Sequence, residues 1–387
     1  MRVSEIHLQN WKNFKEASAS LSRRVFIIGP NASGKSNFLD AFRFLRDVAD
    51  DGLHQAVKSR GGVTSVRCLA ARRSPNIVVG VTLSGGDGRE MWHYELEFNQ
   101  DVNRGPEVRR EEVVDLRSGN EQVVERPNSD DREDEMLLTQ TALEQIAENR
   151  KFREVADFFE AVSYQHIIPQ VVREPQEFSP GRIKEDDPFG RDFLQRVWDK
   201  NEHTRQAWLR RIGNALESVI DQLTDLEVNM DQHGTPHLVA RFEHWRVHDA
   251  KQQEWQLSDG TLRLFGLMWA VFEGSGPLLL EEPELSVHSE IVGALAQLFE
   301  QLQEEIRKMK RTADYEKRQL IISTHAVELL RDAGIGAEEV IWIEPSSEGS
   351  RLRTPNNEQK KALMNGLSVA DVILPMSSPA DQLTLDF

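Results

Sequence analysis

A glycine-rich segment at residues 29–36 constrains the fold more than any other part of this sequence. It reads GPNASGKS and fits the pattern GxxxxGK[ST]. The apolar run at 25–28 before it is typical of a buried strand, and apolar side chains recur at helical spacing over residues 37–48 after it. A strand, a glycine-rich loop and a helix in this order bring the positive end of the helix to the loop, which predicts an α/β fold with a phosphate cradle.

The side chains of this loop have the chemistry that nucleotide binding requires. The glycines let backbone N–H groups turn toward phosphate oxygens, Lys35 supplies a cation, and the Ser36 hydroxyl is suited to binding Mg²⁺. We therefore expect a nucleotide and Mg²⁺ as cofactors. The loop residues expected to contact them are Asn31, Ala32, Ser33, Gly34, Lys35, Ser36 and Asn37.

The composition excludes several classes of protein. No apolar run approaches the roughly 18 residues that span a bilayer, so we expect no membrane segment. The single Cys68 cannot form an internal disulfide and there is no CxxC pair, which favours a reducing cytoplasm. A length of 387 residues allows two or three lobes, or one α/β core with a large insertion.

The charge limits contact with nucleic acid. A formal net charge of −17 argues against a surface that binds DNA or RNA all over, because phosphate would be repelled. A local basic patch stays open, although a basic cluster is more often a solvated face. The candidate pieces of such a patch are Arg72 and Arg73, Arg109 and Arg110, Arg210 and Arg211, and residues 307–318.

The first third of the chain combines the loop with a β-rich stretch. Strand patterns at 77–83 and 91–98 flank the turn signal SGGDG, which predicts a hairpin. Residues 1–125 are therefore expected to form the N-terminal half of the core, with the phosphate cradle and an antiparallel β subdomain.

The rest of the chain is expected to form two further parts. Residues 126–225 are expected as a helical insertion lobe, beginning with a solvated acidic linker at 127–135 and continuing with a helical pattern at 136–162. Residues 226–387 regain strand character and return to the core, and they are expected to end in a flexible tail from about residue 376.

A second motif completes the phosphate cradle. Residues 277–284 read PLLLEEPE, an apolar strand that ends in adjacent carboxylates, as a Walker B element does. Glu281 is expected to hold the water shell of Mg²⁺, and Glu282 is expected to orient or deprotonate the attacking water. Most Walker B strands carry Asp at the first of these positions. Glu281 therefore leaves open whether the protein turns nucleotide over quickly.

The segment LSDGT at 257–261 resembles the LSGGQ signature of ABC-type ATPases. Ser258 is suited to capping the helix that follows it, and the N–H groups near Gly260 form an anion site at the helix N-terminus. The resemblance implies that Ser258, Asp259 and Gly260 contact the γ-phosphate of ATP held by the loop of a second subunit. It therefore implies a homodimer with ATP sandwiched between two heads.

Two further segments carry the same resemblance. The strand pattern at 320–324 ends at His325, which matches the switch histidine of ABC-type ATPases, so we assign His325 a catalytic role at the γ-phosphate. Residues 285–288 resemble the D-loop, with Ser289 where many relatives have proline. The family's Q-loop glutamine has two candidates in this sequence, Gln140 and Gln165.

The order of these motifs resembles the SMC/RecF branch, because signature, Walker B and histidine follow a long middle segment. In that branch the residues equivalent to Lys12 and Asn13 approach the nucleotide. From the 387 residues and the short stretch after His325 we expect neither long coiled-coil arms nor a TOPRIM domain. The resemblance implies an ABC-type P-loop NTPase head with a parallel-type core sheet, an antiparallel β subdomain and a helical insertion lobe.

This resemblance leaves two functions open. The first is an ATP-hydrolysing switch that dimerises on ATP-Mg²⁺ and acts on DNA or a partner effector, in DNA repair or anti-phage defence. The second is a nucleotide-gated scaffold with little turnover that inhibits a separately encoded nuclease or toxin. A transporter ATPase has no positive feature in the sequence.

Two remaining patterns suggest further ligands. The last six residues, QLTLDF from Gln382 to Phe387, resemble the peptides that dock on the bacterial sliding clamp, although an ordinary C-terminus explains them more simply. His233 and His237, like His244 and His248, are four residues apart. Because this region has a strand pattern, we expect no metal there besides the nucleotide's Mg²⁺.

Overall fold

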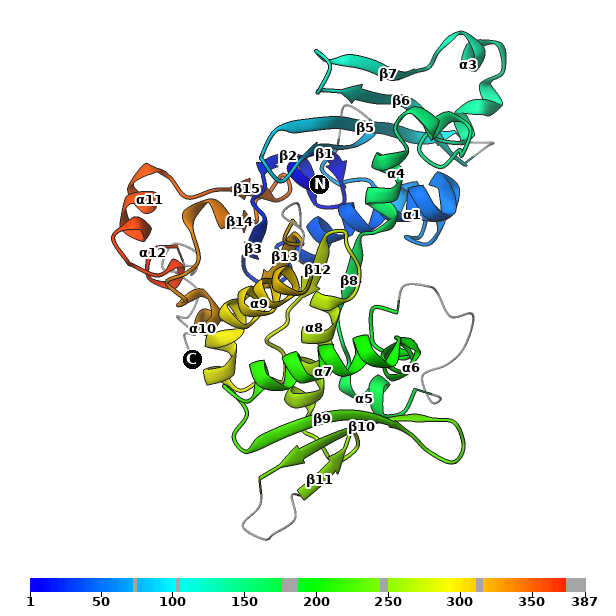
Figure 1. The fold of residues 1–387 in the computed structure, drawn as a ribbon. Coiled ribbons are helices and arrows are strands. Elements are labelled where there is room, and N and C mark those ends of the chain that lie inside the picture. The colour runs from blue at the N-terminus through cyan, green and yellow to red at the C-terminus, as the bar shows by residue number, and fades with distance from the viewer. Residues whose placement is uncertain (72–74, 102–104, 176–186, 244–249, 311–315, 374–387) are drawn as a thin grey trace, which may run out of the picture.

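The computed structural model describes residues 1–71, 75–101, 105–175, 187–243, 250–310 and 316–373 (Figure 1). Several sequence expectations fall outside these ranges: Arg72 and Arg73, residues 311–315 of the basic stretch, His244 and His248, and the tail with Gln382 to Phe387. Among the described helices, none has the length and apolar character that crossing a membrane would need.

One sheet is antiparallel and has six strands in the order β2-β1-β4-β5-β6-β7. The expected hairpin is present, because β4 and β5 pair from Ile77 opposite Phe98 to Ser84 opposite Glu90. This outer sheet is the expected β subdomain. Its strands are β1 Arg2–Trp11, β2 Phe14–Ser20, β4 Ile77–Ser84, β5 Glu90–Asp101, β6 Gly105–Asp115 and β7 Glu121–Arg126.

The core sheet has the order β15-β14-β3-β13-β12-β8 and is parallel except for its edge strand β15. Its four inner strands β14, β3, β13 and β12 are largely apolar because helices or the outer sheet cover both faces. The parallel-type core sheet that the sequence predicts is therefore confirmed. The strands are β3 Arg24–Ile28, β8 Ser163–Gln165, β12 Leu278–Glu281, β13 Leu320–Thr324, β14 Val340–Glu344 and β15 Arg351–Arg353.

Helix α1, Lys35–Lys58, lies between the core sheet and the outer sheet. Its buried face, with Phe38, Phe42 and Leu45, joins side chains of both sheets in one apolar cluster. Helix α4, Arg153–Glu160, packs beside it. The helix that follows the phosphate loop is thus fixed by apolar packing on both sides.

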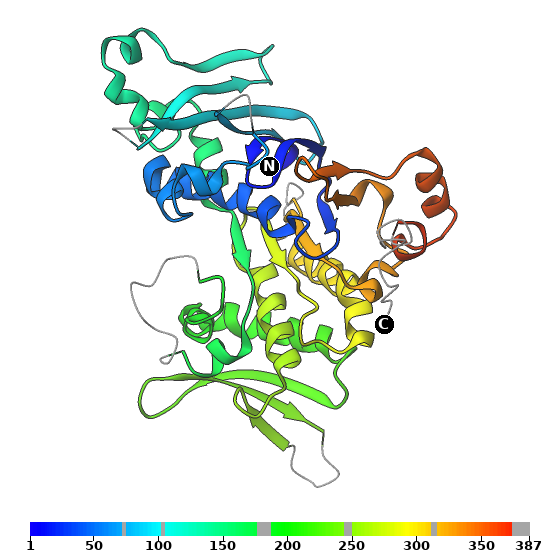
Figure 2. The ribbon, with the colours of Figure 1, turned by 180° about the vertical axis from the view of Figure 1, so that it is seen from behind.

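The other face of the core sheet packs against α8 Asp259–Phe272, α9 Ser289–Lys310 and α7 Glu202–Leu216. A three-stranded antiparallel sheet continues this layer, with strands β9 Leu223–Met230, β10 Pro236–Phe242 and β11 Ala250–Gln253. Figures 1 and 2 place this sheet and the outer sheet at opposite ends of the molecule, with the core sheet between them.

The remaining elements are short. They are α2 Val63–Val66, α3 Ser129–Glu133, η1 Glu135–Thr139, η2 Glu148–Lys151, α5 Pro169–Arg173, α6 Phe193–Asp199, α10 Val327–Leu330, η3 Ala337–Glu339, α11 Asn357–Met364 and α12 Val369–Val372. Strand β8 lies within the stretch expected as a helical insertion, yet it forms one edge of the core sheet.

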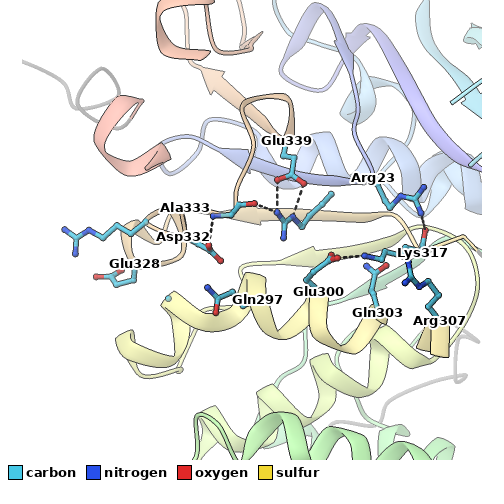
Figure 3. Close-up of a pocket in the computed structure, with 14 residues that line it drawn as sticks. Arg23, Gln297, Glu300, Gln303, Arg307, Lys317, Glu328, Asp332, Ala333 and Glu339 are labelled. Carbon is cyan, nitrogen blue, oxygen red and sulfur yellow. Dashed lines mark hydrogen bonds and ion pairs between the residues drawn. The ribbon is translucent and has the colours of Figure 1, made fainter. Parts of the chain in front are cut away.

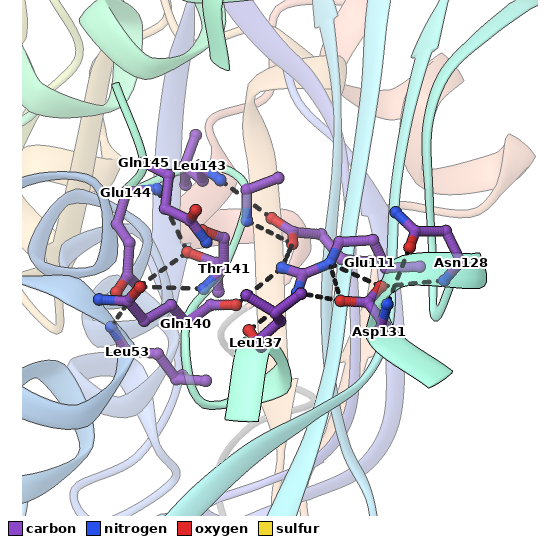
Figure 4. A network of polar contacts seen from close by, with 12 residues as sticks. Leu53, Glu111, Asn128, Asp131, Leu137, Gln140, Thr141, Leu143, Glu144 and Gln145 are labelled. Carbon is purple, nitrogen blue, oxygen red and sulfur yellow. Dashed lines mark hydrogen bonds and ion pairs between the residues drawn. The ribbon is translucent and has the colours of Figure 1, made fainter. Parts of the chain in front are cut away.

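The expectation of a solvated acidic linker at 127–135 is wrong only for Asp131, because the other residues of the segment are exposed. Asp131 is 2% exposed and forms an ion pair with Arg126 at 2.6 Å, and Arg126 also contacts the fully buried Glu111 at 3.4 Å (Figure 4). Arg126 further donates to the backbone carbonyls of Leu137 and Gln140. The Arg126 guanidinium thus ties Asp131 to the outer sheet and to the backbone that follows the segment, while the other acids of 127–135 are exposed.

Residues 136–162 are less helical than their pattern predicts. The segment forms the 3₁₀ turns η1 and η2 before α4 begins, and the Leu137 carbonyl accepts both from Arg126 and from the N–H of Gln140. Glu144 adds a second tether, because it accepts from the backbone N–H of Leu53 at 2.9 Å next to the break in α1 at Gly52.

Candidate nucleotide site

The phosphate loop connects β3 to α1 as the sequence predicts. Gly34 has a φ of 107°, and a Cβ atom there would lie 2.0 Å from Nδ2 of Asn13, so only glycine fits. The Lys35 ammonium points back into the loop and donates to the carbonyls of Gly29 at 3.1 Å and Pro30 at 3.3 Å. The first N–H groups of α1 lack helical partners, so they are free to bind an anion.

Asn13 holds this loop in shape. Its Nδ2 donates to the carbonyl of Ser33 at 2.8 Å, and its Oδ1 accepts from Asn37 at 2.8 Å. Ser350 supports the same carbonyl with its hydroxyl at 2.6 Å. The structure therefore brings Asn13 to the loop, where it positions backbone groups.

Lys12 is engaged elsewhere. Its ammonium forms an ion pair with Asp40 of α1 at 2.6 Å, and Asp40 also pairs with Arg60 at 2.9 Å. Burial alone would raise the pKa of Asp40, but the charges of Arg60 and Lys12 outweigh it and lower the pKa. A contact of Lys12 with a nucleotide stays a prediction.

Ser36 and Glu281, the expected metal pair, are in contact. The Ser36 hydroxyl donates to Oε1 of Glu281. The two residues come from α1 and β12, and β13 lies between β3 and β12 in the sheet. With its proton directed at Glu281, the Ser36 oxygen keeps its lone pairs for a cation. The donor set of one hydroxyl and one carboxylate fits Mg²⁺, which takes few protein ligands and several waters.

Tyr164 completes this contact, and the sequence analysis missed it. Its hydroxyl donates to Oε2, the other oxygen of Glu281. Burial first, and then the hydrogen bond to Glu281, raise the pKa of Tyr164, so the phenol stays protonated. The available signal was its place next to Gln165 at the end of a strand, since neighbours on the same strand end reach the same edge of the sheet.

The expected catalytic pair is also brought together. Glu282 follows β12 with a φ of 45°, a left-handed conformation that is rare for residues other than glycine. Nδ1 of His325 lies 3.3 Å from Oε1 of Glu282. Arg263, from the first turns of α8, donates to the Glu282 carbonyl at 3.2 Å. The signature helix therefore touches the backbone that carries the expected base.

Glu284 is a second residue that the sequence analysis left without a role. It is 8% exposed, and its Oε1 accepts from the Thr324 hydroxyl at 2.8 Å and from the backbone N–H of His325 at 3.1 Å. It thereby fixes the end of β13 from which His325 projects.

The electrostatics around Lys35 are balanced. Burial lowers the pKa of Lys35, and the nearby carboxylates of Glu282, Glu284 and Glu281 oppose this shift. A cation between three carboxylates and a loop of N–H donors is arranged to receive the negative charge of a nucleotide.

The signature residues make their contacts away from the loop of their own chain. Ser258 caps α8, accepting from the N–H of Thr261 at 3.1 Å, as predicted. Asp259 pairs with Arg173 at 2.6 Å. Gly260 lies against the D-loop segment, since a Cβ atom there would be 2.7 Å from the carbonyl of Ser286.

The geometry favours Gln165 over Gln140 as the Q-loop glutamine. Gln165 lies at the carboxyl end of β8, opposite Leu280 of β12, and is 8% exposed. Gln140 is exposed beside the outer sheet, and its carbonyl accepts from Arg126.

A cavity of about 1160 Å³ opens beside the loop, large enough for a nucleotide or a larger ligand. Lys12, Asn13 and Asn37 line it on the loop side. The exposed Leu69 and Phe189 add apolar surface. The arginines that line it, which the sequence analysis did not single out, are Arg43, Arg46, Arg60, Arg67 and Arg191.

A second groove, of about 1090 Å³, lies at the amino ends of the core strands and therefore at the opposite edge from the loop (Figure 3). Arg24 pairs there with Glu339 at 2.8 Å, and Lys317 pairs with Glu300 and Glu304. Because it lies at the opposite edge of the sheet, it is not part of the candidate site.

The other candidate ligand groups are tied to protein partners. Arg109 pairs with Glu107 at 3.3 Å and Arg110 with Glu95 at 3.3 Å, which weakens the case for a basic patch on β6. His237 binds Glu254 at 2.7 Å. Within the described ranges, no group of three or more His, Cys, Asp or Glu side chains is arranged to hold a metal ion.

One family model matches most of the chain. The family model "AAA domain, putative AbiEii toxin, Type IV TA system" matches residues 24–331. No curated protein matches the chain.

Solved structures give the fold. An SMC head bound to the C-winged helix domain of ScpA aligns with a TM-score of 0.57 at 13% identity, covering 93% of this chain and 99% of that chain. An Smc head with an extended coiled coil, bound to the C-terminal domain of ScpA derived from Pyrococcus furiosus, aligns with a TM-score of 0.51 at 11% identity, covering 94% and 98%. The predicted fold class is confirmed.

Proposed function

Since the chain belongs to the AAA-domain family described as putative AbiEii toxin, Type IV TA system, we propose that it is an ATPase that works as a molecular switch. The observation that carries the proposal is the meeting of two pairs at one edge of the core sheet. Ser36 contacts Glu281 beside the loop, and His325 lies next to Glu282. These are the groups that Mg²⁺-dependent hydrolysis of ATP requires.

Each pair has a distinct task. Mg²⁺, when bound with the nucleotide, would be held by Ser36 and Glu281 and would offset phosphate charge. Glu282 orients the attacking water and accepts its proton, and His325 contacts the γ-phosphate. Arg263 and the hydrogen bond from the Glu282 N–H to the carbonyl of Ser323 at 3.0 Å hold this base in place.

We further propose that two copies close head to head. Ser258 and Gly260 lie at the N-terminus of α8, a favourable place for an anion. Their contacts in one chain go to Thr261 and Ser286, so the phosphate they bind would come from a second copy. ATP then binds the dimer better than the monomer, which is the differential affinity that a switch needs.

The partner is proposed by class. The matched SMC heads are each bound to a domain of another protein, ScpA, which supports a protein partner for this chain. The family description names a putative toxin of a type IV TA system. A separately encoded effector, in defence or in repair, is proposed as the partner. DNA and the sliding clamp, through Gln382 to Phe387, remain further proposals.

The alternative is a nucleotide-gated scaffold that inhibits a nuclease or toxin with little turnover. Glu281 in place of the more common Asp leaves this alternative open. Measuring ATP hydrolysis with Mg²⁺, with and without duplex DNA, separates the two. A DNA-acting switch turns ATP over and is stimulated by DNA, whereas a scaffold binds ATP in both conditions with little release of phosphate.

A further inference from the structure

Tyr164 is the residue of the site to which the proposed function gives no task. Its side chain is 6% exposed. One face of its ring is covered by the guanidinium of Arg43 on α1, with Cζ 4.1 Å from the ring centroid. Its hydroxyl donates to Oε2 of Glu281. A buried phenol with its face and its hydroxyl both engaged is held in one orientation.

Glu281 is consequently held at both oxygens. Ser36 donates to Oε1 and Tyr164 donates to Oε2. The donors belong to different elements, α1 and β8, which lie on either side of the carboxylate. Both hydroxyls are protonated at neutral pH, so both are permanent donors to the carboxylate.

This arrangement matters because glutamate has one more rotatable bond than aspartate. A free glutamate side chain samples several rotamers, and ordering it opposes binding. Mg²⁺ demands near-octahedral geometry, so it binds best to a carboxylate that is already in place. A second donor on the far oxygen removes the freedom that the longer side chain adds.

We propose that Tyr164 is a positioning residue for magnesium, which holds the Glu281 carboxylate against Ser36 in the place where these two groups receive the ion. The inference rests on the proposed function, since it assumes that the loop binds the ion with a nucleotide. Tyr164 acts only through Glu281.

The test is equilibrium binding of Mn²⁺, a probe that accepts the same oxygen ligands as Mg²⁺. The full chain is loaded with ADP, and free Mn²⁺ is followed by its electron paramagnetic resonance signal. The Tyr164→Phe variant keeps the ring and its contact with Arg43 but removes the hydroxyl. Losing a hydrogen bond to a charged group is expected to weaken Mn²⁺ binding about tenfold. ADP affinity in EDTA should not change.

Tyr94→Phe is the matched control. Tyr94 is also a buried phenol that donates to a glutamate, Glu111 at 3.2 Å, but it lies in the outer sheet. Its variant is expected to bind Mn²⁺ as the wild type does. A second experiment uses the Glu281→Asp background, in which the shorter side chain withdraws from the phenol. Adding Tyr164→Phe in this background is expected to change Mn²⁺ affinity little.

The outcomes separate the two proposals. If wild-type protein binds neither ADP nor Mn²⁺, the proposed function is wrong and this inference with it. If the wild type binds both and Tyr164→Phe binds Mn²⁺ equally well, only the inference is wrong. An equal loss from Tyr164→Phe in the wild-type and Glu281→Asp backgrounds also overturns it. Should Tyr164→Phe not fold, Tyr164→Leu, which also lacks the hydroxyl, takes its place, and Mn²⁺ binding by this variant as tight as in the wild type would overturn the inference.

Discussion

Nδ1 of His325 lies 3.3 Å from Oε1 of Glu282. Two residues that directly follow neighbouring strands of the core sheet, β13 and β12, are therefore within hydrogen-bonding distance of each other. The Glu284 carboxylate accepts a hydrogen bond from the backbone N–H of His325, and Arg263 donates one to the carbonyl of Glu282. The pair is therefore fixed from both sides before any ligand binds, as a preorganised catalytic group should be.

Replacing Glu282 with Gln should separate ATP binding from hydrolysis. The amide keeps the size of the side chain but cannot accept a proton, and loss of a general base typically costs 10²–10⁴-fold in rate. We expect turnover to fall at least about 100-fold while ATP binding persists and the ATP-bound dimer accumulates. Phosphate release and light scattering with ATP measure the two effects. Glu290→Gln, a change to an exposed carboxylate nearby, is the control, and equal turnover by Glu282→Gln and wild type would remove Glu282 from its role.

Replacing Lys35 with Ala should abolish ATP binding without destabilising the fold. Burial lowers the pKa of Lys35, which shows that its charged form is held at a cost in the free protein. We therefore expect no detectable ATP binding by calorimetry and a melting temperature that does not fall. Lys58→Ala, at the exposed end of the same helix, should bind ATP normally. Retained ATP affinity in Lys35→Ala would contradict the phosphate role.

A mixture of two inactive variants should recover activity if the site is shared between copies. Ser258→Arg disrupts the signature and Lys35→Ala disrupts the phosphate loop. Neither homodimer therefore has a complete ATP site. In the mixed dimer, the intact loop of the first variant faces the intact signature of the second. We expect the equimolar mixture to hydrolyse ATP at a substantial fraction of the wild-type rate. A mixture no more active than its components would argue against a head-to-head dimer.

The sequence predicts the parts of this site that lie close together in the chain. The strand, loop and helix around Lys35 are contiguous in the chain. The period of the apolar side chains and the spacing of the glycines are therefore sufficient to predict them. Glu281 was predicted because it ends an apolar strand as a Walker B element does, whereas His325 was predicted from its resemblance to the switch histidine of ABC-type ATPases. The structure brings them together because parallel strands collect their carboxyl ends at one edge of a sheet.

The missed contacts depend on which strands become neighbours. Tyr164 reaches Glu281 only because β8 pairs with β12. This pairing joins segments that are far apart in the chain, so tertiary packing determines it. Asp131 was predicted to be solvated because charge patterns are local, whereas its partner Arg126 belongs to the outer sheet. A buried charge network is visible in sequence only when both partners share a motif.

Replacing Arg126 with Leu should destabilise the outer sheet strongly. The variant leaves Glu111 and Asp131, which are 0% and 2% exposed, without their cation. Breaking a buried ion pair by removing one partner typically costs 3–5 kcal/mol. We expect the free energy of unfolding in urea to fall by about 3 kcal/mol or more. Arg132→Ala, an exposed neighbour, should change it by less than about 0.5 kcal/mol, and a similar small effect of Arg126→Leu would contradict the network's structural role.

Asp40 should make stability depend on pH in the acid range. Burial favours its neutral form, yet Arg60 and Lys12 outweigh burial and hold the pKa of Asp40 below its ordinary value in the folded protein. A carboxyl with a depressed folded pKa adds stability above its unfolded pKa and loses it as the pH falls through the folded value. We expect Asp40→Asn to be less stable than wild type at pH 7 and this difference to shrink as the pH drops below about 4. Urea unfolding across this range measures it, with the exposed Asp51→Asn as the control. A difference between Asp40→Asn and wild type that stays constant with pH would show that the Asp40 charge does not stabilise the fold through Arg60 and Lys12.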